Sequence, residues 1–275
     1  MIARTYVAAA LLALLAGLTA CSGGSATPAA QESPSPSPSP PAYTPAPAPR
    51  VGQCYRLTPA DVLAPTNAEL AVACTTRHNA QTIAVGLVPR RIGGKQVDVD
   101  APRATAFVAQ RCPKAYARFA GGSQTDRDLS RLKVVWFGPS LQDAEAGARW
   151  YRCDLIGFSR GDTLMRRTKP IRRGVLGSTD RDLFALCGTA APGKPGFQRV
   201  MCSLDDRWRA IATIPLGDGS YPGSAAVREA GDQPCADLTR EAQDFALTYT
   251  YGWEWPTLAQ WQSGQHFGFC WSPRV

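Results

Sequence analysis

Histidine is scarce in this chain, with two residues among 275, and lysine is rare too, with 5 residues against 25 arginines. Two histidines leave few ways to build a histidine-based catalytic triad or a metal site with several histidine ligands. No two cysteines stand closer than 15 positions apart, so the C-x-x-C spacing of zinc and redox motifs does not occur. A structural zinc ion is therefore not expected. Hydrophobic residues still make up 44% of the chain, enough to bury a core.

Long apolar runs are missing as well. Residues 7–20 form an uncharged, mostly apolar stretch of 14, whereas a transmembrane helix needs about 20 such residues. Arg4 precedes this stretch, and Leu18-Thr19-Ala20-Cys21 at its end resembles a bacterial lipobox. We therefore predict a lipoprotein signal peptide at 1–20. The alternative is an ordinary export signal with a chance cysteine.

Lipidation of Cys21 would hold the mature protein by acyl chains such as palmitate rather than by a helix. The predicted location is then the extracytoplasmic face of the cell membrane. Residues 22–50 contain nine prolines, including a Ser-Pro alternation at 33–41. Such a segment forms no core and behaves as a semi-rigid spacer, so 21–50 is predicted to be a tether with a reach of at most roughly 90 Å.

Eight cysteines remain once Cys21 is set aside, and an exported protein forms disulfides. They fall into two sets of four, and the later part of each set is repeated at one spacing. Trp, Pro, Leu, Gly, an aromatic residue and Cys recur 117 positions apart, from Trp136, Pro139, Leu141, Gly147, Trp150 and Cys153 to Trp253, Pro256, Leu258, Gly264, Phe267 and Cys270. The repeat indicates an internal duplication.

The predicted fold class is α+β, with two tandem related units braced by disulfides. Each unit is expected to be a small, mostly antiparallel sheet with one main helix, since strands flank a helix without regular βαβ alternation. The predicted boundaries are a first unit at 51–159, a basic linker at 160–180 and a second unit at 181–275. The expected helices are 104–119, 140–146 and 235–245, and the clearest strands are 132–137, 150–158, 208–215, 248–255 and 267–271.

Eight cysteines allow 105 disulfide connectivities, and spacing alone does not choose among them. The duplication favours bridges that keep each unit self-contained. The pairs of this kind are Cys54–Cys74, Cys112–Cys153, Cys187–Cys202 and Cys235–Cys270.

The motifs of the first unit resemble those of the septum formation family of exported bacterial proteins. They are Val51-Gly52-Gln53-Cys54, then Cys74-x-x-x-His78-x-Ala80, a central Cys112, and the stretch from Pro139 to Cys153. The resemblance covers nearly all of 51–275 and implies an actinobacterial lipoprotein or single-span protein linked to the division septum. It implies a process and a place rather than a reaction. The second unit departs from the pattern, with Trp208 where the first has His78.

Two catalytic patterns are present but incomplete. Residues 157–161 match the G-x-S-x-G nucleophile elbow, but the basic segment that follows is broken by Pro170 where the elbow needs a helix. Residues 188–194 match a phosphate-binding loop until Pro195 replaces the Ser or Thr that binds Mg²⁺. We assign no catalytic residue, no metal and no cofactor.

Binding candidates remain, each with a structural alternative. His78 follows Cys74 in a predicted turn, where an imidazole more often bonds a backbone carbonyl. Arg166, Arg167, Arg172 and Arg173 lie in the basic segment, either solvated or in contact with anionic lipid or wall polymer. Trp253 and Trp255 belong to an alternating aromatic row that either packs in a core or stacks on sugar rings.

The function that these features favour is a non-enzymatic binding or interaction module in cell-envelope or septum-related processes. Its expected partners are the membrane, through the lipid anchor, and a cell-wall polymer or an envelope or division protein. Nucleic acid is not expected outside the cytoplasm. A wall-acting hydrolase and an extracellular ligand sensor are the alternatives, and a deep cleft with converging acids would favour the former.

Overall fold

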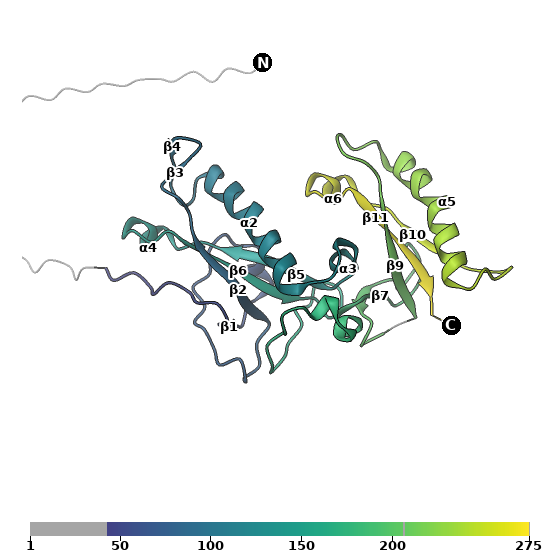
Figure 1. Cartoon of the computed structure of the whole chain (residues 1–275), viewed down its shortest axis with the longest axis horizontal. Coiled ribbons are helices and arrows are strands. Elements are labelled where there is room, and N and C mark those ends of the chain that lie inside the picture. Colours follow the sequence, from purple (N-terminus) through teal and green to yellow (C-terminus); the bar gives the residue numbers. More distant parts are fainter. Residues whose placement is uncertain (1–42, 206, 275) are drawn as a thin grey trace, which may run out of the picture. The chain divides into compact units, whose positions relative to one another are not determined.

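The computed structural model describes residues 43–205 and 207–274. The predicted signal peptide, Cys21 and most of the predicted tether lie outside the described residues. Within them, two antiparallel sheets each carry one long helix (Figure 1). A small hairpin, β3 (Arg91–Ile92) and β4 (Lys95–Gln96), precedes the first of these helices. This arrangement confirms the predicted α+β class.

The first sheet has the strand order β1-β2-β6-β5, and all neighbouring strands are antiparallel. Its strands are β1 (Cys54–Tyr55), β2 (Ala80–Leu87), β6 (Trp150–Gly157) and β5 (Leu132–Phe137). The sequence prediction placed β5 at the same residues and β6 within one residue, because both are apolar, β-branched or aromatic runs bounded by turn residues.

Helix α2 (Pro102–Ala120) covers one face of this sheet (Figure 1). Pro102 stands in the first turn, where its missing N–H costs nothing, and Gly121 ends the helix with a φ of 72°. The buried side of the helix has apolar residues at helical spacing, namely Ala104, Val108, Cys112, Ala115, Tyr116 and Phe119. The Cys112–Cys153 disulfide then fixes α2 to β6.

The second sheet has the order β10-β11-β9-β7-β8. Its strands are β10 (Gly252–Glu254), β11 (Phe267–Pro273), β9 (Trp208–Pro215), β7 (Leu186–Gly188) and β8 (Arg199–Met201). Helix α5 (Ser224–Ala242) packs on it and is fixed to β11 by Cys235–Cys270.

Two boundaries in this half differ from the prediction. The helix begins at Ser224 rather than Cys235, and it ends before Asp244 and Phe245, whose φ angles of 52° and 56° interrupt helical geometry. The strand expected at 248–255 pairs only over Gly252–Glu254. Alternating aromatic residues therefore suggested a longer strand than the backbone forms.

The strand orders β1-β2-β6-β5 and β7-β9-β11-β10 correspond position by position. In each sheet a disulfide joins the long helix to the third of these strands, β6 or β11. The remaining disulfides, Cys54–Cys74 and Cys187–Cys202, also have matching places, so all four are the pairs that the duplication favours. The division into units at 51–159 and 181–275 stays a prediction.

Residues 160–180 pack against the first sheet instead of standing free in solvent. Arg167 pairs through its backbone with His78, and the Ile171 N–H donates to Gln81 Oε1 at 2.7 Å. Leu164 and Ile171 are buried, as are the apolar residues of the short helix η1 (Val175–Gly177). The apolar residues between the arginines therefore anchor this segment to the first sheet.

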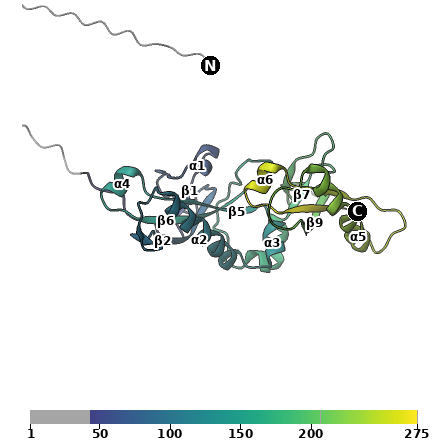
Figure 2. The ribbon, with the colours of Figure 1, turned by 90° about the horizontal axis from the view of Figure 1, so that it is seen from above.

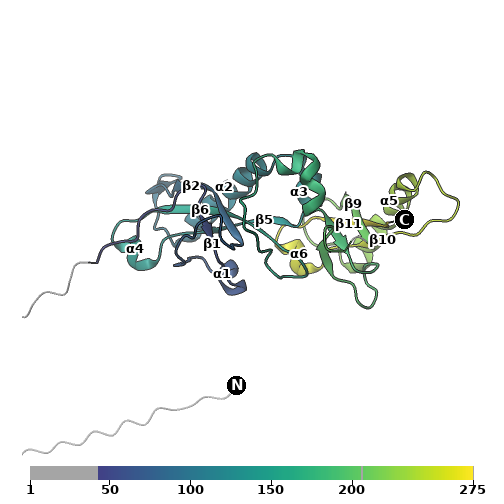
Figure 3. The ribbon, with the colours of Figure 1, turned by 90° about the horizontal axis from the view of Figure 1, so that it is seen from below.

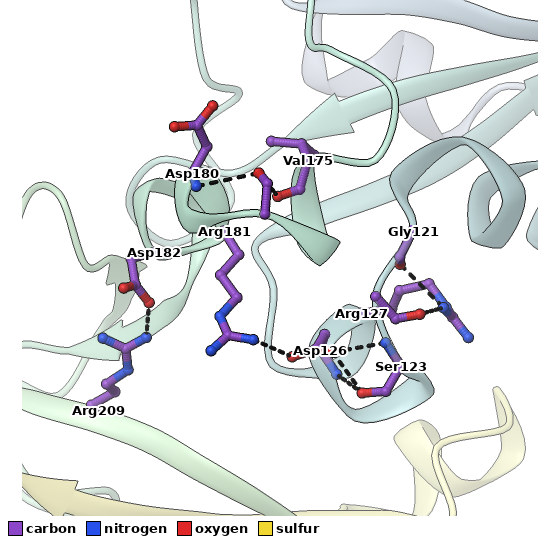
Figure 4. A network of polar contacts seen from close by, with 11 residues as sticks. Gly121, Ser123, Asp126, Arg127, Val175, Asp180, Arg181, Asp182 and Arg209 are labelled. Carbon is purple, nitrogen blue, oxygen red and sulfur yellow. Dashed lines mark hydrogen bonds and ion pairs between the residues drawn. The ribbon is translucent and has the colours of Figure 1, made fainter.

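A polar network connects the short helix that follows α2 to the second half of the chain (Figure 4). Asp126 on α3 (Gln124–Asp128) lies 3.6 Å from Arg181 on η2 (Thr179–Phe184), and Asp182 pairs with Arg209 on β9. Backbone bonds reinforce it, since the Arg131 N–H donates to the Phe184 carbonyl at 2.7 Å. In the turned views α3 lies between β5 and β9 (Figures 2 and 3).

Trp253 lies in the core beneath α5, flanked by two glycines. A Cβ added at Gly231 would lie 1.9 Å from the Trp253 ring, and one at Gly268 would lie 2.2 Å from it. Gly231→Ala is therefore expected to destabilise the fold by about 1–3 kcal/mol, because the indole has to leave its position. Helix propensity alone predicts that the variant gains up to about 1 kcal/mol of stability. The sign of the change in the free energy of unfolding, measured in urea, therefore decides between the steric effect and helix propensity. Gln233→Ala, exposed on the same helix, serves as the control.

Candidate functional site

Two pockets flank Trp150 at the end of the first sheet. We call them the aromatic pocket, of about 590 Å³, and the polar pocket, of about 450 Å³. The second name refers only to the charged residues Arg50, Glu69, Asp143 and Arg152 within a lining that is otherwise mostly apolar. Both are lined by Thr66, Ser140 and Trp150. Volumes of this size suit a small ligand or one or two residues of a polymer.

The aromatic pocket lies between the first turns of α2 and the ends of β5 and β6. Its walls are mostly apolar and aromatic, and they include Val88, Val99, Ala104, Val108, Trp136, Phe137, Leu141 and Tyr151. Ser140 fixes the loop beneath it, because the Ser140 hydroxyl accepts the Asp143 N–H at 3.0 Å and caps α4 (Leu141–Glu145). Few polar groups line this wall, and Thr105 and Asp100 are among them.

The second unit is built differently at the matching place. Trp261 on α6 (Leu258–Gln262) stands 117 positions after Ala144, and its ring stacks on His266 with 4.5 Å between centroids. Tyr221 adds an edge-on contact at 5.6 Å. Ala144, at the corresponding position of α4, has no ring, whereas Leu258 and Trp261 of α6 line a separate pocket of about 430 Å³.

The polar pocket is closed on one side by the end of the predicted tether. Tyr43 and residues 46–50 line it, together with residues 66–71. Asp143 holds this segment, because its Oδ1 accepts both the Tyr43 hydroxyl at 2.7 Å and the Ala46 N–H at 2.8 Å. Hydrogen bonds from Ser140 and Tyr43 lower the pKa of Asp143, so its carboxylate is fully engaged.

Arg152, which lines the polar pocket, forms a buried ion pair with Asp154 on the same strand. Arg152 and Asp154 are 3% and 0% exposed, and Arg152 Nε lies 3.0 Å from Asp154 Oδ2, close but not aligned as a hydrogen bond. Asp154 also accepts the Thr82 hydroxyl at 2.8 Å, and the guanidinium lies 3.7 Å from the Tyr55 ring centre. Burial raises the pKa of Asp154 to about 6, and the charge of Arg152 opposes that rise.

Besides Arg152 Nε, two buried nitrogen donors in this wall have no hydrogen-bond partner among the described residues. They are Trp150 Nε1 and Asn67 Nδ2. The amide of Asn67 is oriented by its oxygen, which accepts Arg152 Nη2 at 2.6 Å. Unpaired buried N–H groups are rare, and they favour a polar partner such as water or an oxygen of a ligand.

His78 lies apart from both pockets. Its side chain is 2% exposed, and Nδ1 lies 2.8 Å from the Thr76 carbonyl. Its backbone exchanges two hydrogen bonds of 2.9 Å with Arg167. These contacts hold the motif histidine in the turn before β2, and its Nε2 is buried without a hydrogen-bond partner among the described residues. Whether this residue has a structural or a functional role stays a prediction.

The four basic candidates are not gathered into one site. Arg167 donates to the Lys169 carbonyl and Arg172 pairs with Asp180 at 2.5 Å. Arg173 donates to the Arg118 carbonyl at 3.4 Å, whereas Arg166 lines a separate pocket. Burial lowers the pKa of Arg167. The charges of this segment therefore point to different neighbours.

The two aromatic candidates, Trp253 and Trp255, differ in burial. Trp253 is 7% exposed and its Nε1 donates to the Val227 carbonyl at 3.3 Å, so it is a core residue. Trp255 is half-buried and donates to Ser224 Oγ at 3.3 Å. The G-x-S-x-G serine, Ser159, bonds the Thr163 carbonyl and is followed by a turn rather than a helix. Cys21 lies outside the described residues.

Sequence reasoning did not single out Trp150, Arg152 and Asp154 as a group. The sequence contained a signal that could have identified them, because the 117-residue offset aligns these three residues with Phe267, Phe269 and Trp271. At two of these positions the first copy has a charged residue, Arg152 or Asp154, where the other copy has an aromatic one, which indicates a different environment for that face. No group of three or more potential metal-ligating His, Cys, Asp or Glu side chains occurs in the described part of the chain. No helix there is long and apolar enough to cross a membrane.

Comparison with protein families matches residues 51–270 to the septum formation family. No curated protein and no solved structure matches the chain. The family is not a known enzyme family, and it suggests a role related to cell division. The match covers most of the chain and agrees with the resemblance in the cysteine, histidine and Pro139–Cys153 motifs. The chain therefore belongs to the septum formation family.

Proposed function

We propose that this chain is a lipoprotein held through Cys21 on the extracytoplasmic face of the membrane. There it acts as a non-enzymatic binding protein in cell division, with a component of the cell wall as its ligand. The pocket pair beside Trp150 is the observation that carries this proposal. The two pockets share Thr66, Ser140 and Trp150, and their walls contain buried N–H donors without a hydrogen-bond partner among the described residues, on Trp150, Asn67 and Arg152.

The chemistry of the two pockets suits an amphipathic ligand. Aromatic rings such as Trp136 and Tyr151 pack against the apolar faces of sugar rings and short aliphatic groups. The donors of Trp150 and Asn67 suit carbonyl or hydroxyl oxygens. Wall polymers combine sugars with amide groups. Three carboxylates line the two pockets, Glu69, Asp100 and Asp143, and Asp143 is engaged in holding the tether end.

Blocking the aromatic pocket tests this proposal. Thr105 is exposed on α2 and lines the pocket, so Thr105→Trp would fill it without disturbing the core. We expect the purified chain to sediment with labelled peptidoglycan and Thr105→Trp to lose at least about 10-fold in affinity, the effect of about 1.4 kcal/mol. Thr105→Ser is the matched control and should bind as the wild type does.

Release of soluble fragments from the labelled polymer by the wild type would overturn the non-enzymatic proposal in favour of the hydrolase. Equal binding by Thr105→Trp and Thr105→Ser would remove the pocket from the binding site. Absence of sedimentation in all three would exclude the wall as ligand and leave an envelope protein to be sought by crosslinking.

A further inference from the structure

Charge is divided unevenly along the folded chain. Residues 51–180 contain 20 Lys and Arg against 11 Asp and Glu, whereas residues 181–275 contain 8 against 10. The whole excess of positive charge therefore belongs to the first sheet, its helix and the segment 160–180. Since the two halves have corresponding sheets and helices, their folds do not account for the difference.

The two long helices show the contrast most clearly. Helix α2 has four cations and no acid, whereas α5 has two cations and four acids. On α2, Arg111, Lys114 and Arg118 follow each other at spacings of three and four and so share one exposed side. An amphipathic helix needs polar residues on its outer face but not charges of one sign, so this stripe calls for a further reason.

The segment after the first sheet extends the stripe. Arg173 reaches the last turn of α2, where it donates to the Arg118 carbonyl, and the Gly174 N–H donates to the Phe119 carbonyl at 2.7 Å. We call the combined set the cationic surface; its members are Arg103, Arg111, Lys114, Arg118 and Arg173. All five are exposed, and none forms an ion pair with a carboxylate in residues 43–205 or 207–274.

We propose that the cationic surface docks on the anionic headgroups of a membrane. None of its five residues lines any of the five best-formed pockets of the described residues, so the charges are spread over a surface rather than gathered in one of these hollows. The tether also enters this half, because Tyr43 is bound to Asp143. This second argument rests on the proposed lipid anchor, which would hold the chain within the tether's reach of the bilayer. Juxtamembrane cations add about 1 kcal/mol each near an anionic surface.

Vesicle flotation of residues 22–275 tests the docking separately from the lipid. This form lacks both the lipidation site and the apolar stretch 7–20, and we expect it to bind vesicles containing phosphatidylglycerol but not pure phosphatidylcholine vesicles. Adding Arg103→Gln, Lys114→Gln and Arg118→Gln should weaken the binding on the order of 100-fold. Lys194→Gln, Arg228→Gln and Arg240→Gln remove three exposed cations from the second half and should change it less than about 2-fold. High salt should abolish it.

Equal binding to both kinds of vesicle, or equal losses in the two triple variants, would overturn the docking surface. Loss of peptidoglycan sedimentation by the first triple variant, with vesicle binding unchanged, would assign the surface to a wall polymer instead. The lipidated chain should float with both kinds of vesicle. If it floats only with anionic ones, the proposed anchor fails while the docking surface stands.

Discussion

Replacing Arg152 with methionine is expected to destabilise the fold by about 3–5 kcal/mol. The substitution keeps most of the side chain's length but leaves Asp154, which is 0% exposed, as a buried carboxylate without a cation. The Thr82 hydroxyl would remain as its hydrogen-bond donor and does not neutralise the charge. Chemical unfolding in urea at pH 7 measures the loss.

The double variant Arg152→Met with Asp154→Leu should recover most of that stability, because a well-packed apolar pair often replaces a buried ion pair at little cost. Arg199→Met is the matched control in the second half. Its pair with Glu254 spans 2.8 Å, but the side chains are 25% and 21% exposed, so water screens the remaining carboxylate and the loss should be smaller. Equal losses from the two single variants would contradict the importance of burial.

The same variant should also respond to pH. The pKa of Asp154 is raised above its ordinary value, so protonation favours the folded state, and this contribution is lost as pH rises through about 6. Without Arg152 the pKa rises further. The stability deficit of Arg152→Met should therefore shrink as pH falls from 7 toward 5, and Asp154→Leu in the same background should remove that dependence.

Removing the Cys112–Cys153 bridge with two alanines is expected to cost about 4 kcal/mol. The bridge closes a loop with a sequence separation of 41, and the unfolded chain gains the corresponding freedom when it is lost. Cys187–Cys202 closes a separation of 15, for which the same relation gives about 3 kcal/mol. Both double-alanine variants avoid a free thiol, and thermal and urea unfolding compare them.

The two bridges should differ more clearly in binding than in stability. Cys112 fixes α2, whose first turns form a wall of the aromatic pocket, whereas Cys187 and Cys202 connect β7 to the end of β8 in the other half. Loss of the first bridge should weaken peptidoglycan binding even where the chain is folded. Equal binding by the two double-alanine variants would show that α2 keeps its place without the disulfide.

The sequence by itself determined the elements whose pattern is local. Leu132–Phe137 and Trp150–Gly157 are apolar strands between turn residues, and the helix after Pro102 has its apolar residues at spacings of three and four. The disulfide pairing could also be predicted from the sequence, but for a different reason. A duplicated chain folds into duplicated sheets, so the repeat restricted the bridges to pairs within each copy.

Only the tertiary structure decided what covers each face. The 117-residue offset aligns Arg152 with Phe269, but it does not reveal that Asp154 and Tyr55 enclose the guanidinium. In the same way, Trp253 alternates with its neighbours like a surface row, yet α5 buries it against Gly231. Alternation along a strand assigns side chains to opposite faces. Whether a face meets solvent, a helix or a returning loop depends on segments distant in the sequence, and their packing sets burial, charge pairing and pocket shape.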